Sequence, residues 1–175
     1  KDGSFSPLPL KSVDTGSGLE RLAMVMNGHD SVYETDLLQP LMDLSQKLIG
    51  VKEQRTMRML SDHIRAAVMI LAEGVLPGNE GQGYIPRRLI RKCVAACISR
   101  GVEKPNFNPH IEKTVELLGA HYPQLKSAKD AIIYNIEQAQ LIVWRSLLNH
   151  DNWLVANHLP KIDNLLCPNQ SNSYG

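Results

Sequence analysis

The chain has 175 residues, a mass of 19.5 kDa, and 19 Lys and Arg against 18 Asp and Glu. This length is enough for one medium domain or two small ones and for a core that needs no disulfides. The near-neutral charge excludes a uniformly basic protein, so any surface for a nucleic acid must be local. Three cysteines without a CxxC pair predict no disulfide framework and favour a reducing compartment, and we expect a cytoplasmic protein.

The ends of the chain and its apolar runs set further limits. The longest apolar run, 66–72, is far shorter than the roughly 20 residues of a transmembrane helix, so we expect no membrane segment. The chain starts at Lys1 without Met and without a basic-then-apolar signal pattern. We therefore expect it to begin inside a longer protein.

The N-terminal residues predict a strand, a turn and a helix. Residues 5–15 contain two prolines and separated apolar side chains before Gly16 and Gly18, which is typical of one or two short strands that enter a glycine turn. Apolar residues then recur at helical spacing from Leu19 to Met26, and Gly28 is a plausible end for that helix.

Helical periodicity dominates the rest of the chain, so the sequence predicts a mainly α protein. The expected helices are 34–50 with Thr35 or Asp36 as its cap, a helix around 60–71 that ends before Gly74 and Pro77, 84–100 with Pro86 in its first turn, 111–119, and 125–149. Residues 160–175 are rich in Asn, Ser and Pro and are expected to fray.

The glycine turn is the first candidate site. Glycines let a backbone approach a ligand closely, and Arg21, one turn into the helix, suits phosphate oxygens. Asp14 adds a carboxylate just before Gly16 and Gly18. On these residues alone, an ordinary turn with a solvent-facing arginine is the simpler interpretation.

The second candidate is a basic helix face. Arg87, Arg88, Arg91 and Lys92 gather on one side of the predicted helix 84–100, which contains no acidic residue. A charged face is usually only solvated, but like charges at this spacing repel one another, which favours a phosphate backbone as their partner. Asn79, in the loop before this helix, can contact base edges or build the turn.

Cysteine and histidine spacing indicates no metal site. Cys93 and Cys97 lie one turn apart on the apolar side of helix 84–100 and are expected to be buried small residues rather than metal or redox groups. The six histidines show no HxxxH or HExxH spacing.

Three ordered stretches resemble one family. Residues 12–23, SVDTGSGLERLA, resemble the third signature motif of class II aminoacyl-tRNA synthetases in the form of the alanyl-tRNA synthetase family. Residues 62–67, DHIRAA, and the segment from 74 to 92 resemble the helical region that follows it in the same family. The likeness covers roughly residues 2–101.

The resemblance implies roles at matching positions. Arg21 would contact the phosphates of ATP, Asp14 would face the amino group of alanine, and Gly16 and Gly18 would form the floor of that site. Magnesium would accompany ATP. Asn79 would lie near the third base pair of the tRNA acceptor stem. The family also implies that this basic helix, with Arg87, Arg88, Arg91 and Lys92, holds the stem. We take Arg87, Arg88 and Arg91 as the candidates for phosphate contacts.

The resemblance also implies an architecture and a function. Residues 1–28 would end the antiparallel-sheet catalytic domain, 29–160 would form a helical tRNA-recognition domain, and 161–175 a flexible tail. The whole protein would activate alanine with ATP and transfer it to tRNA. A synthetase-like paralogue that binds without charging, and a ligase that loads a carrier protein, remain alternatives. The oligomeric state stays open.

Departures from the family pattern bear on tRNA discrimination. This chain lacks the two class II motifs that come earlier in the family, so we expect it to form no adenylate alone. It also lacks the later segment whose aspartate joins the asparagine in contacting the acceptor stem. The family usually has Ser at position 78, Met at position 17, and an aliphatic residue at position 86, where this chain has Gly, Ser and Pro.

Overall fold

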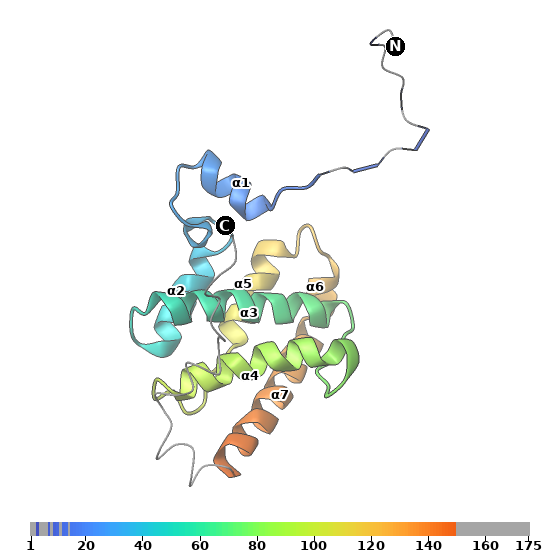
Figure 1. Ribbon diagram of the computed structural model, residues 1–175. Coiled ribbons are helices and arrows are strands. Elements are labelled where there is room, and N and C mark those ends of the chain that lie inside the picture. The colour runs from blue at the N-terminus through green and yellow to red at the C-terminus, as the bar shows by residue number, and fades with distance from the viewer. Residues whose placement is uncertain (1–2, 4–6, 8, 11, 14, 150–175) are drawn as a thin grey trace.

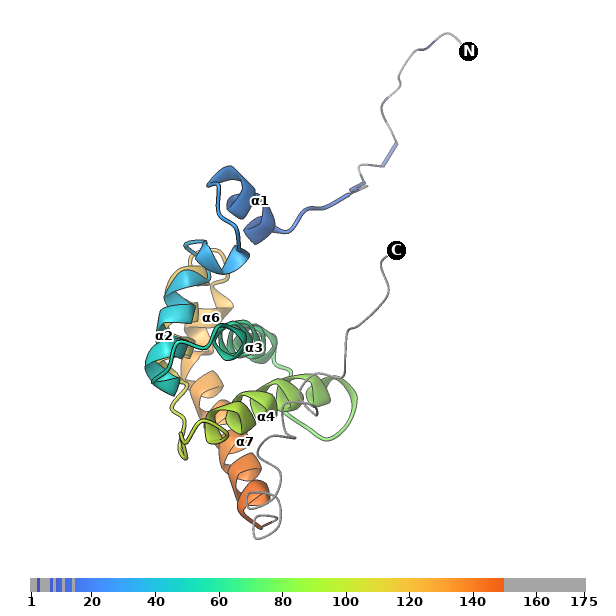
Figure 2. The same ribbon diagram turned by 60° about the vertical axis from the view of Figure 1, so that its left-hand side comes forward.

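Helices make up the regular structure in the computed structural model, which describes residues 3, 7, 9–10, 12–13 and 15–149. In chain order the elements are α1 (Leu19–Met26), the 3-10 helix η1 (Val32–Glu34), α2 (Gln39–Ile49), α3 (Gln54–Ala72), the 3-10 helix η2 (Gly81–Gly83), α4 (Tyr84–Ile98), α5 (Asn108–Leu118), α6 (Gln124–Ser127) and α7 (Lys129–Asn149). Helices α2 to α7 pack together, and α1 lies outside them at one end (Figures 1 and 2). The prediction of a mainly α chain is confirmed.

Helix α3 is the centre of the bundle and packs against α2, α4, α5, α6 and α7. Its predicted stripe of Leu60, Ile64, Ala67, Val68 and Leu71 is buried throughout. This spacing of three and four residues places all five side chains on one face of a helix. The predicted end is also confirmed, because Gly74 follows α3 with φ of 83°, a left-handed conformation that favours glycine.

The predicted helix 34–50 begins five residues later than expected, at Gln39. Neither Thr35 nor Asp36 caps it: the hydroxyl of Thr35 donates instead to the carbonyl of Val32 at 2.6 Å, which closes η1. Pro40 then fixes the start, since proline lacks the N–H that a position deeper in the helix would need. The predicted end at Gly50 is confirmed.

The predicted helix 125–149 is two helices, α6 and α7, that meet at Ala128. Of the residues expected to form strands, those that the structure describes between 7 and 15 form none. A strand needs a neighbouring strand for its backbone hydrogen bonds, and the described residues offer it no such partner. The expected tail, 161–175, lies outside the described residues, and the predicted boundary at residue 28 stays a prediction.

A polar cluster lies inside the core where α2, α3 and α5 meet. The hydroxyl of Ser45 lies 3.0 Å from that of Ser61 and 3.0 Å from Nε2 of His110. Both serines also donate to carbonyls one turn back in their own helices. His110 is 1% exposed, and its Nδ1 has no hydrogen-bond partner. Burial lowers the pKa of His110 to about 4, so the ring is neutral near pH 7.

Candidate functional site

The glycine turn leads directly into α1. Gly18 precedes the helix, and its carbonyl accepts a hydrogen bond from the N–H of Leu22 at 3.0 Å. The Arg21 side chain is exposed and folds back toward the start of the helix, so that its Cδ would lie 3.7 Å from a Cβ placed at Gly18. A Cβ at Gly16 would meet no atom within 4 Å. The turn therefore leaves open space around an accessible guanidinium.

The structure brings together only part of this predicted site. Gly16, Gly18 and Arg21 lie on one short segment, whereas Asp14 lies outside the described residues. Neither glycine is packed against backbone here, so the predicted close floor is not formed by the described residues alone.

The loop between α3 and α4 is closed by its own backbone. The N–H of Gly78 donates to the carbonyl of Gly83 at 2.9 Å. A Cβ at Gly83 would lie 2.5 Å from the carbonyl oxygen of Leu76, so only glycine fits that position without a shift of the backbone. This closure presents Asn79 and its neighbour Glu80 to solvent, immediately before η2, which leads into α4.

The predicted basic face of α4 is present on the surface. Arg88 and Arg91 are exposed, and Arg87 and Lys92 are half-buried at the two sides of the face. Within the described part of the chain, none of these four forms an ion pair. The cations of the chain that do have carboxylate partners lie elsewhere and include Arg65, Arg100, Lys113 and Lys129. The face thus combines positive charge with accessibility.

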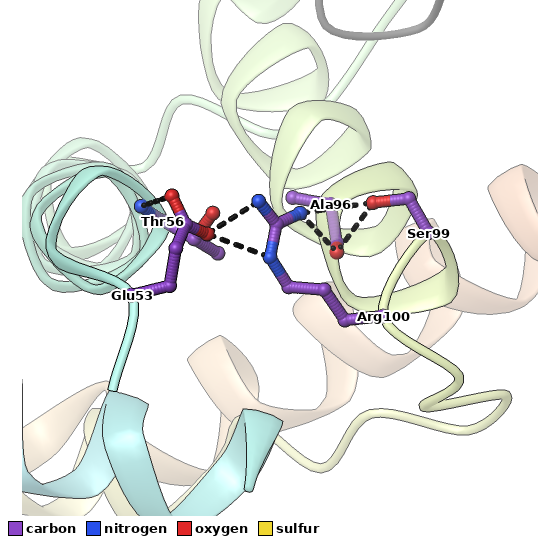
Figure 3. Close-up of polar contacts among 5 residues, drawn as sticks. All are labelled: Glu53, Thr56, Ala96, Ser99 and Arg100. Carbon is purple, nitrogen blue, oxygen red and sulfur yellow. Dashed lines mark hydrogen bonds and ion pairs between the residues drawn. The ribbon is translucent and has the colours of Figure 1, made fainter. Parts of the chain in front are cut away.

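Arg100, which follows α4, differs from the cations of the basic face because it has a carboxylate partner. Arg100 binds Oε2 of Glu53 through Nε at 2.8 Å and through Nη2, and it also donates to the carbonyl of Ala96 and the hydroxyl of Ser99 (Figure 3). Burial acts in the opposite direction, but hydrogen bonds from Thr56 and Arg100 lower the pKa of Glu53. Arg100 is therefore committed to holding α3 and α4 together.

A groove between α3 and α4 adjoins the basic face and has a volume of about 510 Å³. Lys92 belongs to both the face and the groove, and Arg58 lies 5.2 Å from the centre of the Tyr33 ring at the groove. Its other lining residues are Gln54, Arg55, Thr56, Met59, Asp62, His63, Ala96 and Arg100. No site predicted from the sequence included this groove, although two arginines three residues apart at the start of α3, Arg55 and Arg58, were a visible signal.

Both cysteine thiols of α4 lie in the core. Cys93 and Cys97 are each 0% exposed, which confirms the prediction of buried small residues. Burial raises the pKa of Cys97 to about 12 and that of Cys93 still more clearly above its usual value.

Among the described residues, no group of three His, Cys, Asp or Glu side chains is placed to hold a metal ion. No helix in that part of the chain has the length and hydropathy to cross a bilayer.

Comparison with known proteins identifies relatives that share most of this chain. It is 44% identical over 133 residues to the alanine–tRNA ligase of Xanthomonas axonopodis pathovar citri, which covers 75% of this chain and 15% of that protein. The alanine–tRNA ligase of Psychrobacter cryohalolentis is 38% identical over 161 residues, 91% of this chain and 18% of the relative. The chain thus spans about one-sixth of the length of these relatives.

The family comparison covers the glycine turn, the loop and the basic face together. A family profile described as "tRNA synthetases class II (A)" matches residues 1–147. That range includes α1 to α6 and nearly all of α7. The chain therefore belongs to the class II tRNA synthetase family.

Proposed function

We propose that this chain is the part of an alanine–tRNA ligase that joins the ATP-binding motif to the helices that hold the tRNA acceptor stem. The observation that carries this proposal is the accessible basic face of α4, which forms no ion pair among the described residues and lies beside the exposed Asn79. Membership of the class II family and relatives named alanine–tRNA ligase support the choice of reaction.

The glycine turn and Arg21 would serve amino acid activation. In this reaction an alanine carboxylate oxygen attacks the α-phosphorus of ATP in line, and the bond to the leaving pyrophosphate breaks. Arg21 would neutralise phosphate charge, and Asp14 would bind the alanine ammonium; neither role needs a shifted protonation state. The exposed guanidinium and the open space at Gly16 fit a bulky polyphosphate. Magnesium would accompany ATP, but its ligands are not assigned to the described residues.

The N-terminal segment would complete the catalytic sheet. The outer face of α1 exposes Leu19, Leu22 and Met26 by 65%, 53% and 77%. Apolar side chains at this spacing are suited to cover a sheet, and residues 5–15 would supply its terminal strand. We place the domain boundary near residue 28, where Gly28 with φ of 68° ends the turn after α1, and assign 29–160 to the tRNA-recognition domain.

The basic face would bind the sugar-phosphate backbone of the acceptor stem. Arg87, Arg88 and Arg91 would contact phosphates, and Lys92 would extend the positive charge into the groove. These contacts position an RNA without reading its sequence, whereas Asn79 at the loop offers an amide for a base edge. The loop closure through Gly78 and Gly83 supports that assignment, because it fixes where Asn79 emerges.

The test of RNA binding is a gel-shift titration of alanine tRNA at several salt concentrations. Replacing Arg87, Arg88 and Arg91 by Gln is expected to weaken binding and to reduce the slope of log K against log salt by roughly one for each lost phosphate contact. The control replaces Lys113, Lys126 and Lys129 by Gln, which removes the same charge from α5, α6 and α7. Equal binding by the two triple variants would contradict the assignment to α4.

The test of activation uses the full-length protein. Alanine-dependent exchange of pyrophosphate into ATP is expected, and Arg21→Ala or Asp14→Ala is expected to abolish it. Exchange that depends on another amino acid, or that survives both substitutions, would contradict the proposal.

A further inference from the structure

The helix that carries Arg21 has little apolar contact with the other described residues. None of its residues is buried, and its apolar side chains Leu19, Leu22 and Met26 are exposed. A short turn and η1 connect it to the bundle that comes after it in the chain, and both views show it outside the packed helices (Figures 1 and 2). Among the described residues, apolar packing therefore does not fix the rotation of α1 relative to α3.

A polar contact connects this helix to the centre of the bundle. Oε1 of Glu20 lies 2.7 Å from Nη1 of Arg65 on α3, and the two side chains are 29% and 20% exposed. Arg65 stands between Ile64 and Val68, which are 3% and 0% exposed. The contact therefore ties α1 to a helix that is held firmly by its own buried face.

The charges around Arg65 favour this arrangement. The pKa of Glu20 is lowered by a hydrogen bond from its own backbone N–H and then by Arg65, while Asp62 acts in the opposite direction. Asp62 lies one turn before Arg65, and its pKa is lowered first by a hydrogen bond from His63 and further by Arg65. The guanidinium thus interacts with a carboxylate on each side, one of them on α1.

We propose that Glu20 and Arg65 are positioning residues for Arg21, because their contact sets the rotation of α1 relative to α3. This inference rests on the proposed role of Arg21 at the ATP phosphates. Arg21 follows Glu20 and projects about 100° further around the helix. A side-chain tip about 5–6 Å from the helix axis moves about 1 Å when the helix turns by roughly 10°.

Such a displacement is large on the scale of catalysis, since a misplacement of about 1 Å can reduce a rate by roughly 10²-fold. Helix α3 also packs along α4, which carries the basic face. The Glu20–Arg65 contact therefore joins the helix proposed to bind ATP with the pair of helices proposed to bind RNA.

The experiment is a double-mutant cycle in the full-length protein, measured by alanine-dependent ATP–pyrophosphate exchange. Glu20→Gln, Arg65→Gln and the double variant are each expected to raise the KM for ATP roughly tenfold, by the same factor and without change in the midpoint of thermal unfolding. Arg65→Lys keeps the charge and is expected to restore part of the lost affinity. Effects that multiply in the double variant would overturn the pairing.

Arg100→Gln is the matched control, because it breaks an ion pair of similar exposure between Glu53 and Arg100. It is expected to lower the unfolding midpoint while the KM for ATP stays unchanged. Amide hydrogen exchange gives a readout that does not depend on ATP: Glu20→Gln should accelerate exchange in α1 but not in α3.

The outcomes separate this inference from the function on which it rests. If Arg21→Ala abolishes exchange while Glu20→Gln leaves the KM for ATP and the amide exchange of α1 unchanged, the positioning role is wrong and the phosphate role stands. If Arg21→Ala has no effect, both are wrong.

Discussion

Replacing His110 tests the polar cluster in the core through the pH dependence of stability. His110 is 1% exposed, and burial lowers its pKa from 6.5 to about 4. Above pH 6.5 the ring is neutral in both the folded and the unfolded chain, so it causes no loss of stability. Between pH 6.5 and 4 the unfolded chain binds a proton that the folded chain does not, and stability falls with decreasing pH.

The size of this loss follows from the shift in pKa. Each pH unit inside the window from 6.5 to 4 changes the free energy of unfolding by at most about 1.4 kcal/mol. At pH 5 the accumulated loss is about 2 kcal/mol, which is a large part of the stability of a typical domain. Carboxylates also titrate near this pH, so the informative quantity is the difference between wild type and variant.

Urea unfolding followed by circular dichroism at pH 7, 6 and 5 measures that difference. In His110→Leu the decline in stability from pH 7 to pH 5 is expected to be about 2 kcal/mol smaller than in wild type. His121→Gln is the control, because His121 is exposed, and it should follow the wild-type curve. Parallel curves for wild type and His110→Leu would refute the reasoning, as would an NMR titration of His110 with a midpoint near 6.5.

Three further predictions concern the core and the loop. Leu60→Ala removes a side chain that is 0% exposed and should lower the free energy of unfolding by about 2–5 kcal/mol in urea titrations. Gly83→Ala places a Cβ 2.5 Å from a backbone oxygen and should lower both the unfolding midpoint and the proposed affinity for alanine tRNA. Gly78→Ser, whose Cβ would have only ordinary contacts, should change neither measurement. Cys93 and Cys97 should resist iodoacetamide in the folded chain and react in urea, as peptide mass spectrometry would report; rapid labelling without urea would contradict their burial.

Local patterns predicted α3 and α4 well because residues close together in the sequence determine which side chains of these helices are buried and where the helices end. Leu60 to Leu71 repeats at helical spacing, and left-handed glycines follow at 74 and 101. The start of α2 could not be predicted in the same way. Thr35 has two possible partners for its hydroxyl, a helix N–H or the carbonyl of Val32, and η1 decides between them.

Contacts between distant residues had no local signal at all. Glu20 and Arg65 are 45 residues apart, and Arg100 and Glu53 are 47 apart. The sequence could show that these side chains carry opposite charges but not which ones meet. It could predict the exposure of Arg88 and Arg91, since the absence of acidic residues from α4 left their charge without a partner in the helix itself.

The absence of acidic residues from α4 leads to a prediction in which stability and RNA binding change in opposite directions. On a helix, Arg91 lies four residues after Arg87 and three after Arg88, and like charges at these spacings repel. Arg91→Glu replaces both repulsions by attractions, so the free energy of unfolding of the free chain should rise by about 0.8–2 kcal/mol at low salt. The gain should shrink in 1 M salt, where such interactions are screened. The same substitution places a carboxylate on the proposed RNA surface and should weaken tRNA binding more than Arg91→Gln does. A variant that is both more stable and an equally tight binder would show that the charge of α4 serves something other than a phosphate backbone.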